Sequence, residues 1–401
     1  MPSDRSPRDI AVLGAGVAGL TVALELLKLG ERVSIIDSSI GAGASNVAAG
    51  MLAPASEANF GETILTEMML EASIYWEPFH LGLEEISKLS VDYRTSGTLV
   101  VAADQGDMAD LERSASYLTG VGMDVRELRR SEVRDVEPLL GSDLAGVFKV
   151  VGDHQVHNRH LIAALTRAFQ NLGGNWIKGL VENIAERENG IELQLSSEQT
   201  DLNSAQFPNG ATTKDPLYFD SCVIASGAWS ATICDLIGAE SVSRNLMPVK
   251  GQILRIRAER HYGPPEHVIR GSVNGRHVYL VPRLDGEVVV GATMEEVGFD
   301  SGQRIGAISD ILEDATRVVP SVREAEFRES SVGFRPGTSD NLPVLGRLST
   351  RIWAHFGHFR HGILLSPLTA RYTAAAIVGH EVPPWFVSCS PERFATGVNE
   401  G

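Results

Sequence analysis

Cysteine is scarce in this sequence, since 401 residues contain three cysteines and no CxxC pair. A sparse, odd-numbered set does not suit a disulfide framework and is typical of a reducing compartment, so we predict a cytoplasmic protein. The polar N-terminus lacks the features of a signal peptide, and no apolar run reaches the length of about 18 residues that a membrane span requires. We therefore predict neither secretion nor a membrane span.

Basic residues are also in deficit, with 35 Lys and Arg against 51 Asp and Glu and a net charge of -16. Because nucleic-acid binding needs clustered cations, this balance argues against a nucleic-acid partner. The sequence has no GxSxG elbow and no P-loop, so acyl and phosphoryl transfer have no support. Two histidine runs lack an HExxH motif and carboxylates at ligand spacing, and we predict no metal site in either: His154, His157 and His160; His355, His358 and His361.

The first motif present is a βαβ unit close to the N-terminus. Residues 10–13 form a short apolar run that predicts a buried strand, and glycines in a GxGxxG pattern follow it at once. Apolar residues then recur at helical spacing as far as Gly30, and a second β-rich run ends at Asp37. Such glycines permit a tight turn and the approach of a pyrophosphate, and the acid accepts hydrogen bonds from a ribose 2′-hydroxyl. The unit predicts a dinucleotide, either FAD or NAD rather than NADP, in contact with Gly14, Gly16, Val17, Ala18, Gly19 and Asp37.

Long side chains are nearly absent from residues 41–54, GAGASNVAAGMLAP. A surface loop of this length would usually carry more charge, so the missing bulk suggests that a ligand lies close to the backbone. A dinucleotide is long, and its second half must leave the first βαβ unit. The backbone N–H groups of this segment, with Ser45 and Asn46, offer polar contacts to it. We interpret residues 41–54 as a second cradle for the cofactor.

GxGxxG, Asp37 and GASNVAAGMLAP together resemble the amine-oxidising flavoproteins of the D-amino-acid oxidase superfamily. The segment AAGMLAP is most similar to the glycine oxidases of thiamine biosynthesis, and the resemblance runs in the expected order from Ile10 to about Gly379. A homotetramer is a further expectation of the resemblance. The resemblance implies FAD as the cofactor. It also implies that residues of three later segments hold the cofactor: Ser45, Ala49, Gly50 and Met51; Val181; Gly227 and Trp229.

The other patterns predict an α/β fold in which an FAD-binding Rossmann-like domain is interleaved with an antiparallel-sheet α+β substrate domain. Residues 246–300 alternate strongly, and Asn274-Gly275 and Asp285-Gly286 predict hairpin turns there. We assign residues 8–90, 151–240 and 330–382 to the FAD-binding domain, and 91–150 and 241–329 to the substrate domain.

Four stretches carry local predictions of their own. Residues 91–104 alternate like two strands joined by a turn, and 107–140 are predicted to be helical. A helix is expected over 302–319, and the polar residues 196–216 predict an exposed loop.

A strand over residues 352–356, a loop and a helix close the fold. By the resemblance, the N-terminus of this helix faces the pyrimidine edge of the flavin, where its partial positive charge stabilises an anionic reduced flavin. Backbone at Gly362, Ile363 and Leu364 would then contribute to the cofactor site. The family usually has Asn where this sequence has His361, which brings a titratable group to the flavin edge.

Arg335, within GFRPG, is the best candidate to anchor a substrate carboxylate. Its guanidinium fork matches a carboxylate in two parallel hydrogen bonds. The resemblance gives the same role to the matching arginine, close to the cofactor. It also implies Arg360 as a second arginine, Tyr279 as a partner in the carboxylate site and Met294 as the wall of a small pocket.

The resulting hypothesis is an FAD-dependent oxidase of glycine, small amines or small D-amino acids. Hydride passes from Cα to flavin N5, and O2 is reduced to hydrogen peroxide. The resemblance implies that the glycine imine supplies thiamine thiazole synthesis. Two alternatives remain open: a D-amino-acid dehydrogenase that uses a quinone acceptor, and a non-catalytic flavin-binding subunit.

Overall fold

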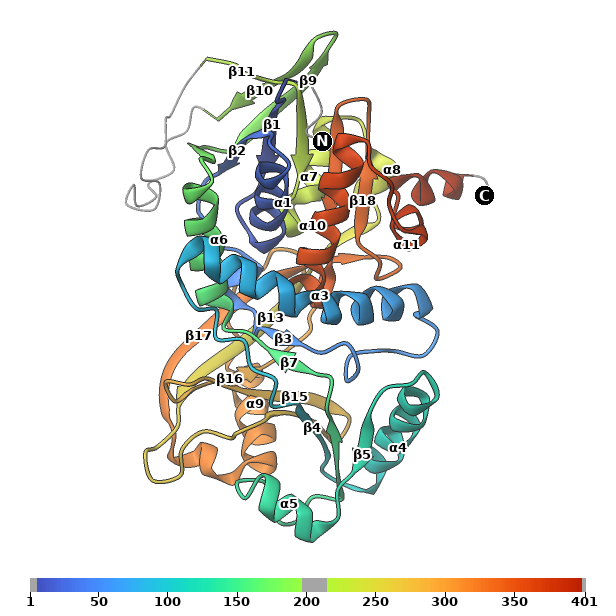
Figure 1. The fold of residues 1–401 in the computed structure, drawn as a ribbon. Helices are drawn as coiled ribbons and strands as arrows, with labels where there is room; N and C mark the ends of the chain where they lie inside the picture. The colour runs from blue at the N-terminus through green and yellow to red at the C-terminus, as the bar shows by residue number, and fades with distance from the viewer. Residues whose placement is uncertain (1–5, 197–214, 399–401) are drawn as a thin grey trace.

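The computed structural model describes residues 6–196 and 215–398, and it divides them between two large sheets. Figure 1 shows the sheets one above the other, with the long helix α3 (Thr63–Ser87) lying between them. This arrangement confirms the predicted mixed α/β fold class. The predicted loop over residues 196–216 falls almost wholly outside the described residues.

The upper sheet has the order β18-β19-β12-β1-β2-β8, with all neighbours parallel except β18. The apolar run at residues 10–13 is buried along nearly its whole length, as expected for a strand covered on both faces. The strands are β1 (Asp9–Leu13), β2 (Arg32–Asp37), β8 (Asn175–Lys178), β12 (Ser221–Ile224), β18 (Val344–Arg347) and β19 (Ile352–Phe356).

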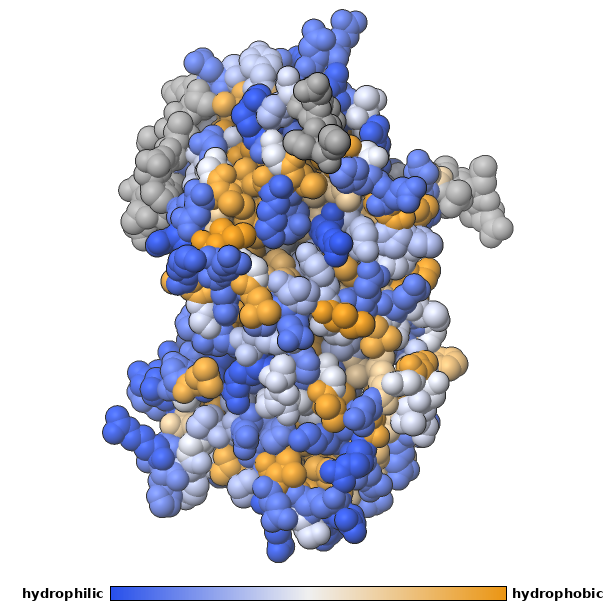
Figure 2. All heavy atoms as spheres, viewed as in Figure 1, coloured by the Kyte–Doolittle hydropathy of each residue, from blue (hydrophilic) through white to orange (hydrophobic). Residues whose placement is uncertain are grey.

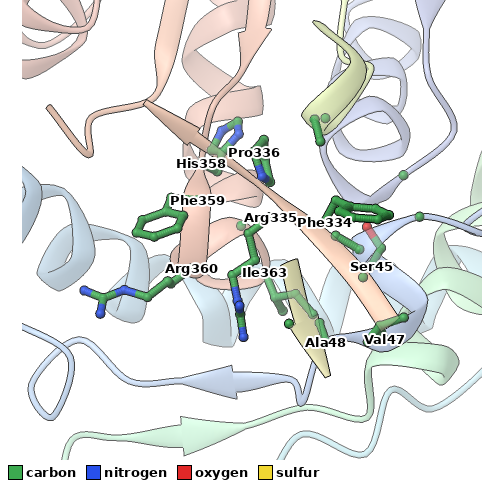
Figure 3. Close-up of a pocket in the computed structure, with 18 of the residues that line it drawn as sticks. Ser45, Val47, Ala48, Phe334, Arg335, Pro336, His358, Phe359, Arg360 and Ile363 are labelled. Carbon is green, nitrogen blue, oxygen red and sulfur yellow. The ribbon is translucent and has the colours of Figure 1, made fainter. Parts of the chain in front are cut away.

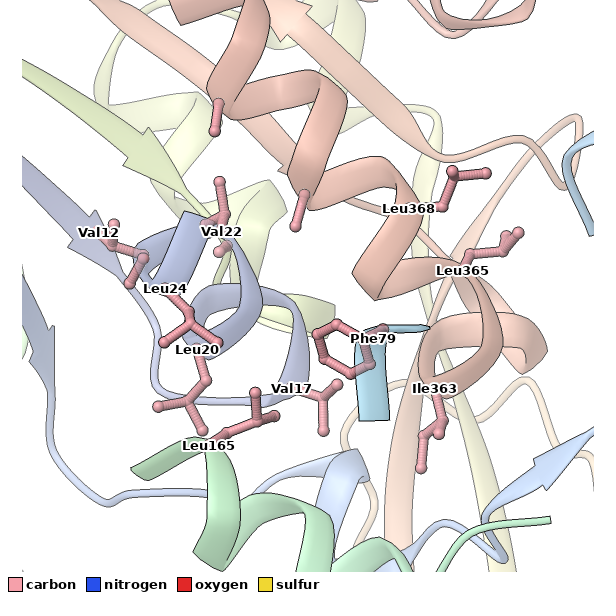
Figure 4. Close-up of a cluster of buried hydrophobic side chains, with 14 of the residues drawn as sticks. Val12, Val17, Leu20, Val22, Leu24, Phe79, Leu165, Ile363, Leu365 and Leu368 are labelled. Atoms are coloured by element: carbon pink, nitrogen blue, oxygen red, sulfur yellow. The ribbon is translucent and has the colours of Figure 1, made fainter. Parts of the chain in front are cut away.

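Helices cover one face of the upper sheet and a small sheet covers the other. Helix α1 (Val17–Lys28) packs between α6 (Asn158–Asn171) and α10 (Gly362–Val378), and Figure 4 shows their apolar side chains meeting in one cluster. On the opposite face, apolar residues of β9 (Val181–Arg187) and β10 (Gly190–Leu195) close a second cluster. Strand β11 (Leu217–Phe219) completes that three-stranded sheet.

The lower sheet has the order β17-β13-β16-β15-β14-β4-β6-β5, and only β14 and β4 are parallel neighbours. Both predicted hairpin turns are confirmed, and Asn274 and Gly275 adopt the positive φ values that a two-residue hairpin needs. The strands are β4 (Thr98–Ala102), β5 (Val125–Glu127), β6 (Gly146–Val150), β13 (Leu246–Arg257), β14 (Val268–Val273), β15 (Arg276–Pro282), β16 (Glu287–Gly291) and β17 (Glu326–Thr338).

Helix α9 (Ile305–Val318) covers one face of the lower sheet and packs on an apolar cluster of that face. Figure 2 shows apolar residues on the molecular surface in small groups among polar ones. Across the described residues, no helix combines the length and apolar character of a membrane span. The remaining elements are α2 (Ala44–Val47), β3 (Met51–Leu52), α4 (Gln105–Gly120), α5 (Arg130–Val136), β7 (His154–Gln155), α7 (Ser230–Leu236), α8 (Glu240–Ser243), α9 (Ile305–Val318) and α11 (Pro384–Ser388).

Two local predictions are wrong in detail. Residues 91–104 contain one strand, β4, because the preceding residues pair with β7 through a bridge between Arg94 and Gln155 instead of folding back as a hairpin. The stretch 107–140 is helical at both ends, but β5 intervenes and joins the sheet edge beside β6. The domain boundaries stay a proposal, and the one at residue 330 cuts β17, which pairs with β13 along its length.

Candidate functional site

One large cavity, about 1600 Å³ in volume, lies where the parallel strands of the upper sheet end. The ends of β1 and β2 line it, as do the residues that follow β12 and β19. In open parallel sheets, ligands bind at the carboxyl ends of strands. The opposite wall comes from β13, β15 and β17 of the lower sheet, and Figure 3 shows Arg335 on that side and Ser45 on the other.

The glycine-rich turn after β1 is shaped partly by the protein itself. Gly14 has φ +119°, and a Cβ there would lie 2.5 Å from the carbonyl oxygen of Ala225. A Cβ on Gly19 would lie 1.8 Å from the carbonyl oxygen of Gly14, so Gly19 is needed for the packing of α1 on the turn. Gly16 differs, because its Cβ would meet no protein atom closer than the Ser45 hydroxyl oxygen, at 3.3 Å. The open space beside Gly16 belongs to the cavity.

Asp37 reaches back to the same turn. One carboxylate oxygen accepts the N–H of Ala15 at 2.6 Å, and the other accepts the N–H of Ser39 at 3.0 Å. Burial raises the pKa of Asp37, and the N–H donors oppose that shift. The carboxylate therefore holds the turn while it also lines the cavity, where the sequence predicted a contact to a ribose.

The small-residue segment 41–54 forms a second backbone wall of the cavity. The Ser45 hydroxyl accepts the N–H of Val17 at 3.0 Å, which joins this wall to the first turn of α1. Gly50 has φ +76°, and a Cβ there would lie 2.0 Å from the carbonyl oxygen of Val156. Thus part of the missing bulk serves close packing of two backbones, and the remainder opens onto the cavity.

Two residues that the sequence did not single out hold this segment from behind. The buried Arg283 donates to the carbonyl oxygens of Ala49 and Val156. The buried Asn158 donates to the carbonyl oxygens of Ser45 and Asn46, and both of its hydrogen bonds measure 2.9 Å. Burial and the nearby charge of Arg255 lower the pKa of Arg283 to about 10. The sequence carries no local indication of either residue's role, because Arg283, for example, is 234 positions from Ala49, whose carbonyl oxygen it binds.

The predicted substrate residues meet on the lower-sheet wall. Arg335 lies within β17, and it donates to the carbonyl oxygen of Thr293 at 3.1 Å. No carboxylate among the described residues pairs with it. Burial raises the pKa of Tyr279, and the charge of Arg335 opposes that shift. Met294 lines the cavity with a side chain that is 61% exposed.

Two glycines make room for these side chains. A Cβ on Gly251 would lie 2.5 Å from an Arg335 guanidinium nitrogen, and a Cβ on Gly291 would lie 2.5 Å from the Tyr279 hydroxyl. Both glycines belong to strands that neighbour the side chain in the sheet, β13 and β16. Gly291 directly follows three valines in β16, and this was a sequence signal that we did not use.

The loop between β19 and α10 carries the remaining predicted residues. Gly362 and Ile363 line the cavity, whereas Leu364 is buried behind it and its carbonyl oxygen accepts the Trp76 indole N–H at 2.9 Å. Arg360 is exposed at the cavity and lies over the Phe359 ring. His361 is buried away from the cavity lining, beside Glu57.

The structure thus brings most predicted residues to a single cavity. Three lie just behind its lining: Gly19, His361 and Leu364. Those that line it are Gly14, Gly16, Val17, Ala18, Asp37, Ser45, Ala49, Gly50, Met51, Val181, Gly227, Trp229, Tyr279, Met294, Arg335, Arg360, Gly362 and Ile363.

Each histidine run has one acidic partner at contact distance, Asp92 beside His160 and Glu57 beside His361. His154 lies in β7, and His157 and His160 stack in the first turn of α6. His355 and His358 make separate hydrogen bonds to threonines of α10. Within the described ranges, no group of three or more His, Cys, Asp or Glu side chains could hold a metal ion.

An elongated ligand with an anionic centre fits this arrangement. The first turn of α1 has no acidic residue, and its N-terminus opens on the cavity between the two backbone walls. Arg335 lies on the far wall, and the N-terminus of α10 lies on the same cavity.

Residues 9–376 match the family described as DAO, FAD dependent oxidoreductase. The chain is 31% identical to the glycine oxidase of Geobacillus kaustophilus (strain HTA426), over 91% of this chain and 92% of the relative. It is 30% identical to the bifunctional protein ThiO/ThiG of Trichormus variabilis, of which it spans about half, 55% of the length. The crystal structure of glycine oxidase from Geobacillus kaustophilus superposes with a TM-score of 0.85 and 30% identity, covering 97% of this chain and 99% of that one.

Proposed function

The chain belongs to the DAO family of FAD-dependent oxidoreductases, and on that premise we propose that it is an oxidase of glycine and other small amines. FAD is its cofactor. The observation that supports the proposal is the position of Arg335. Its guanidinium has no carboxylate partner among the described residues, and it faces the cavity that the glycine-rich turn also lines. An amino acid is a ligand that would supply that carboxylate.

The residues present fit FAD. The turn at Gly14 and Gly16 with the N-terminus of α1 would hold the pyrophosphate, Asp37 the ribose, and the Ser45–Met51 wall the central part of the cofactor. The N-terminus of α10 would lie at the flavin, where its dipole favours negative charge. Bound FAD supplies the acceptor for a hydride from the substrate Cα and passes the electrons to O2.

The chain's own contribution is to bind and orient the substrate. Arg335 would hold the carboxylate in two parallel hydrogen bonds, and the Tyr279 hydroxyl would complete that site. The raised pKa of Tyr279 keeps the hydroxyl protonated and therefore a donor at neutral pH. Holding the amino acid by its carboxylate fixes where Cα lies, which converts binding energy into orientation. Met294 would exclude water and limit the size of the side chain accepted.

The test is a stereospecific substrate panel with peroxide detection. Glycine, sarcosine, proline and both enantiomers of alanine are mixed with the holoenzyme, first anaerobically to record bleaching of the flavin absorbance and then in air. The proposal expects bleaching and peroxide with glycine or sarcosine. A flavin that is indifferent to every amine in the panel would overturn it.

A parallel assay separates the two alternatives. A quinone-dependent dehydrogenase would bleach with substrate but give little peroxide until a quinone acceptor is present. A non-catalytic subunit would keep its FAD and show no change when Arg335 is replaced. The Arg335→Lys variant keeps the charge and removes the fork, so a large rise in KM with intact FAD content supports the carboxylate role.

We also propose that the product imine feeds thiamine thiazole synthesis. The support is the likeness to a protein named ThiO/ThiG, in which the matching region makes up 55% of the length. A cytoplasmic location and a homotetramer belong to the same set of proposals. Complementation of a thiamine auxotroph tests the role in thiazole synthesis, and light scattering of the holoenzyme tests the homotetramer.

A further inference from the structure

The loop between β19 and α10 has an unusual backbone. Gly357 has φ +80° and Phe359 has φ +46°. A left-handed conformation is rare for a bulky aromatic residue, and it persists where the surroundings hold it in place. The same loop presents Phe359 and Arg360 to the cavity and leads directly into the first turn of α10 (Figure 3).

Two buried histidines hold this loop at its two ends. His358 Nε2 lies 3.0 Å from the Thr369 hydroxyl, a contact within the loop and its own helix. His361 Nδ1 lies 3.2 Å from a carboxylate oxygen of Glu57, which belongs to a distant part of the sequence. The other ring nitrogen of His361 is buried and has no partner within the described part of the chain. Glu57 is therefore the polar anchor of the ring.

Glu57 is in turn tied to two other parts of the fold. Its second oxygen pairs with Arg270 in β14 of the lower sheet. The turn that carries Glu57 is held by the fully buried Asp153, which accepts the N–H of Ala55 at 3.0 Å and that of Ser56 at 3.2 Å. A single carboxylate thus connects the strained loop to the sheet that carries the substrate residues.

The charges around Glu57 keep it ionised. Burial by itself would raise its pKa, but the charges of Arg270, His361 and Arg360 hold that pKa well below its usual range. A buried carboxylate makes short, charge-assisted hydrogen bonds to its donors, and these fix geometry more firmly than neutral ones.

We propose that Glu57 is a positioning residue. Held between His361 and Arg270, its carboxylate keeps the loop at residues 357–361 in the strained conformation that presents Arg360 and the first turn of α10 to the cavity. The catalytic consequence rests on the proposed function, but the positioning itself does not. The residue expected at position 361 from the resemblance is Asn, which also offers an N–H donor to this carboxylate.

Hydrogen exchange of the FAD-loaded protein, followed by mass spectrometry, tests the positioning without any turnover. In Glu57→Gln, peptides covering residues 356–364 should exchange about tenfold faster or more, because loss of a charged hydrogen bond increases local opening. Glu137→Gln is the matched control. Glu137 lies 3.5 Å from His267 with a side chain that is 2% exposed, against 11% for Glu57, and unlike Glu57 it lies outside the cavity lining. It should leave residues 356–364 unchanged.

Variants of the histidine keep the proposal testable if Glu57→Gln does not fold. His361→Leu should reproduce the faster exchange, and His361→Asn should stay within about threefold of wild type because it retains a donor. Wild-type exchange of residues 356–364 in His361→Leu or in Glu57→Gln would overturn the proposal. So would an equal effect of Glu137→Gln.

A kinetic experiment measures the KM for glycine in the same variants. The proposal expects a KM rise of about tenfold in Glu57→Gln, rescued by neither pH nor excess FAD, and little change in Glu137→Gln. If glycine is not a substrate of the wild type, the proposed function fails while the exchange data still decide the positioning. A KM unchanged in Glu57→Gln alongside faster exchange would overturn the catalytic part.

Discussion

Gly16 gives the most direct test of the cofactor site, because the protein alone does not explain why it is glycine. Its φ of -77° is open to any residue, and a Cβ would come no closer than 3.3 Å to a protein atom. Gly19, three residues later, is different, since its Cβ would lie 1.8 Å from a backbone oxygen. We therefore expect Gly16→Ala to fold and to bind FAD poorly, and Gly19→Ala to fold poorly.

The magnitudes follow from the geometry. In Gly16→Ala the loss of a good N-cap residue opposes the gain from a stiffer unfolded chain, so the free energy of unfolding of the apoprotein should change by less than about 1 kcal/mol. A methyl group pressed against a bound pyrophosphate should cost about 1–3 kcal/mol, which is roughly a 5- to 150-fold weaker FAD affinity. In Gly19→Ala the clash is with backbone, and the destabilisation should reach about 3 kcal/mol or more.

The assay separates binding from folding. FAD is removed, the apoproteins are titrated with FAD by flavin fluorescence, and their unfolding in urea is measured in parallel. Wild-type FAD affinity in Gly16→Ala would refute the placement of the pyrophosphate at this turn. Equal destabilisation of the two apoproteins would refute the distinction between a glycine required by the ligand and one required by packing.

Three further predictions concern single residues. Arg335→Lys should raise the KM for glycine roughly 100-fold, which corresponds to a loss of about 3 kcal/mol in binding free energy, and should leave the FAD content unchanged. A KM near that of wild type would contradict the carboxylate role. Gly251→Ala, whose Cβ would lie 2.5 Å from the Arg335 guanidinium, should weaken carboxylate inhibitors without altering FAD affinity, as a difference-spectrum titration can show. Burial lowers the pKa of His358 to about 3, below its unfolded value of about 6.5, so this histidine makes stability fall as pH drops through that window. Its share between pH 7 and 5 is about 2 kcal/mol, and urea unfolding should show the loss smaller by that amount in His358→Gln, where His355 and His157 still contribute.

The parts of the fold that the sequence revealed are those set by local pattern. The run at residues 10–13, the glycines after it and Asp37 lie within 30 residues of one another, and their spacing carries the whole βαβ unit. The hairpin at Asn274-Gly275 was equally local, since positive φ at two successive residues selects such pairs. The predicted strand pair at residues 91–104 failed for the opposite reason. Alternation does not identify the partner, which here is β7, more than 50 residues later.

The candidate site likewise contains residues with a local sequence pattern and residues without one. Most residues of the motifs line the cavity, whereas the buried polar residues that fix those motifs had no local signature. Glu57 meets Arg270 across 213 positions, and Asn158 meets Ser45 across 113. Such contacts depend on the final packing of two sheets, and a single sequence holds no periodic signal for them.

The hydrogen bonds behind the small-residue wall explain how it can hold an anion. A backbone loop offers donors and acceptors in equal number, and its carbonyl oxygens would repel a phosphate. Here Asn158 takes up the carbonyl oxygens of Ser45 and Asn46, and Arg283 takes up that of Ala49. Neither of these two side chains lines the cavity, so those carbonyl oxygens point away from it. Within the wall, Asn46 and Ala48 donate their N–H groups to the carbonyl oxygens of Gly43 and Ala44, so an anion would be held by other N–H groups of the wall and by the N-terminus of α1. The buried cation of Arg283, though far from the motif in sequence, therefore gives the loop its polarity.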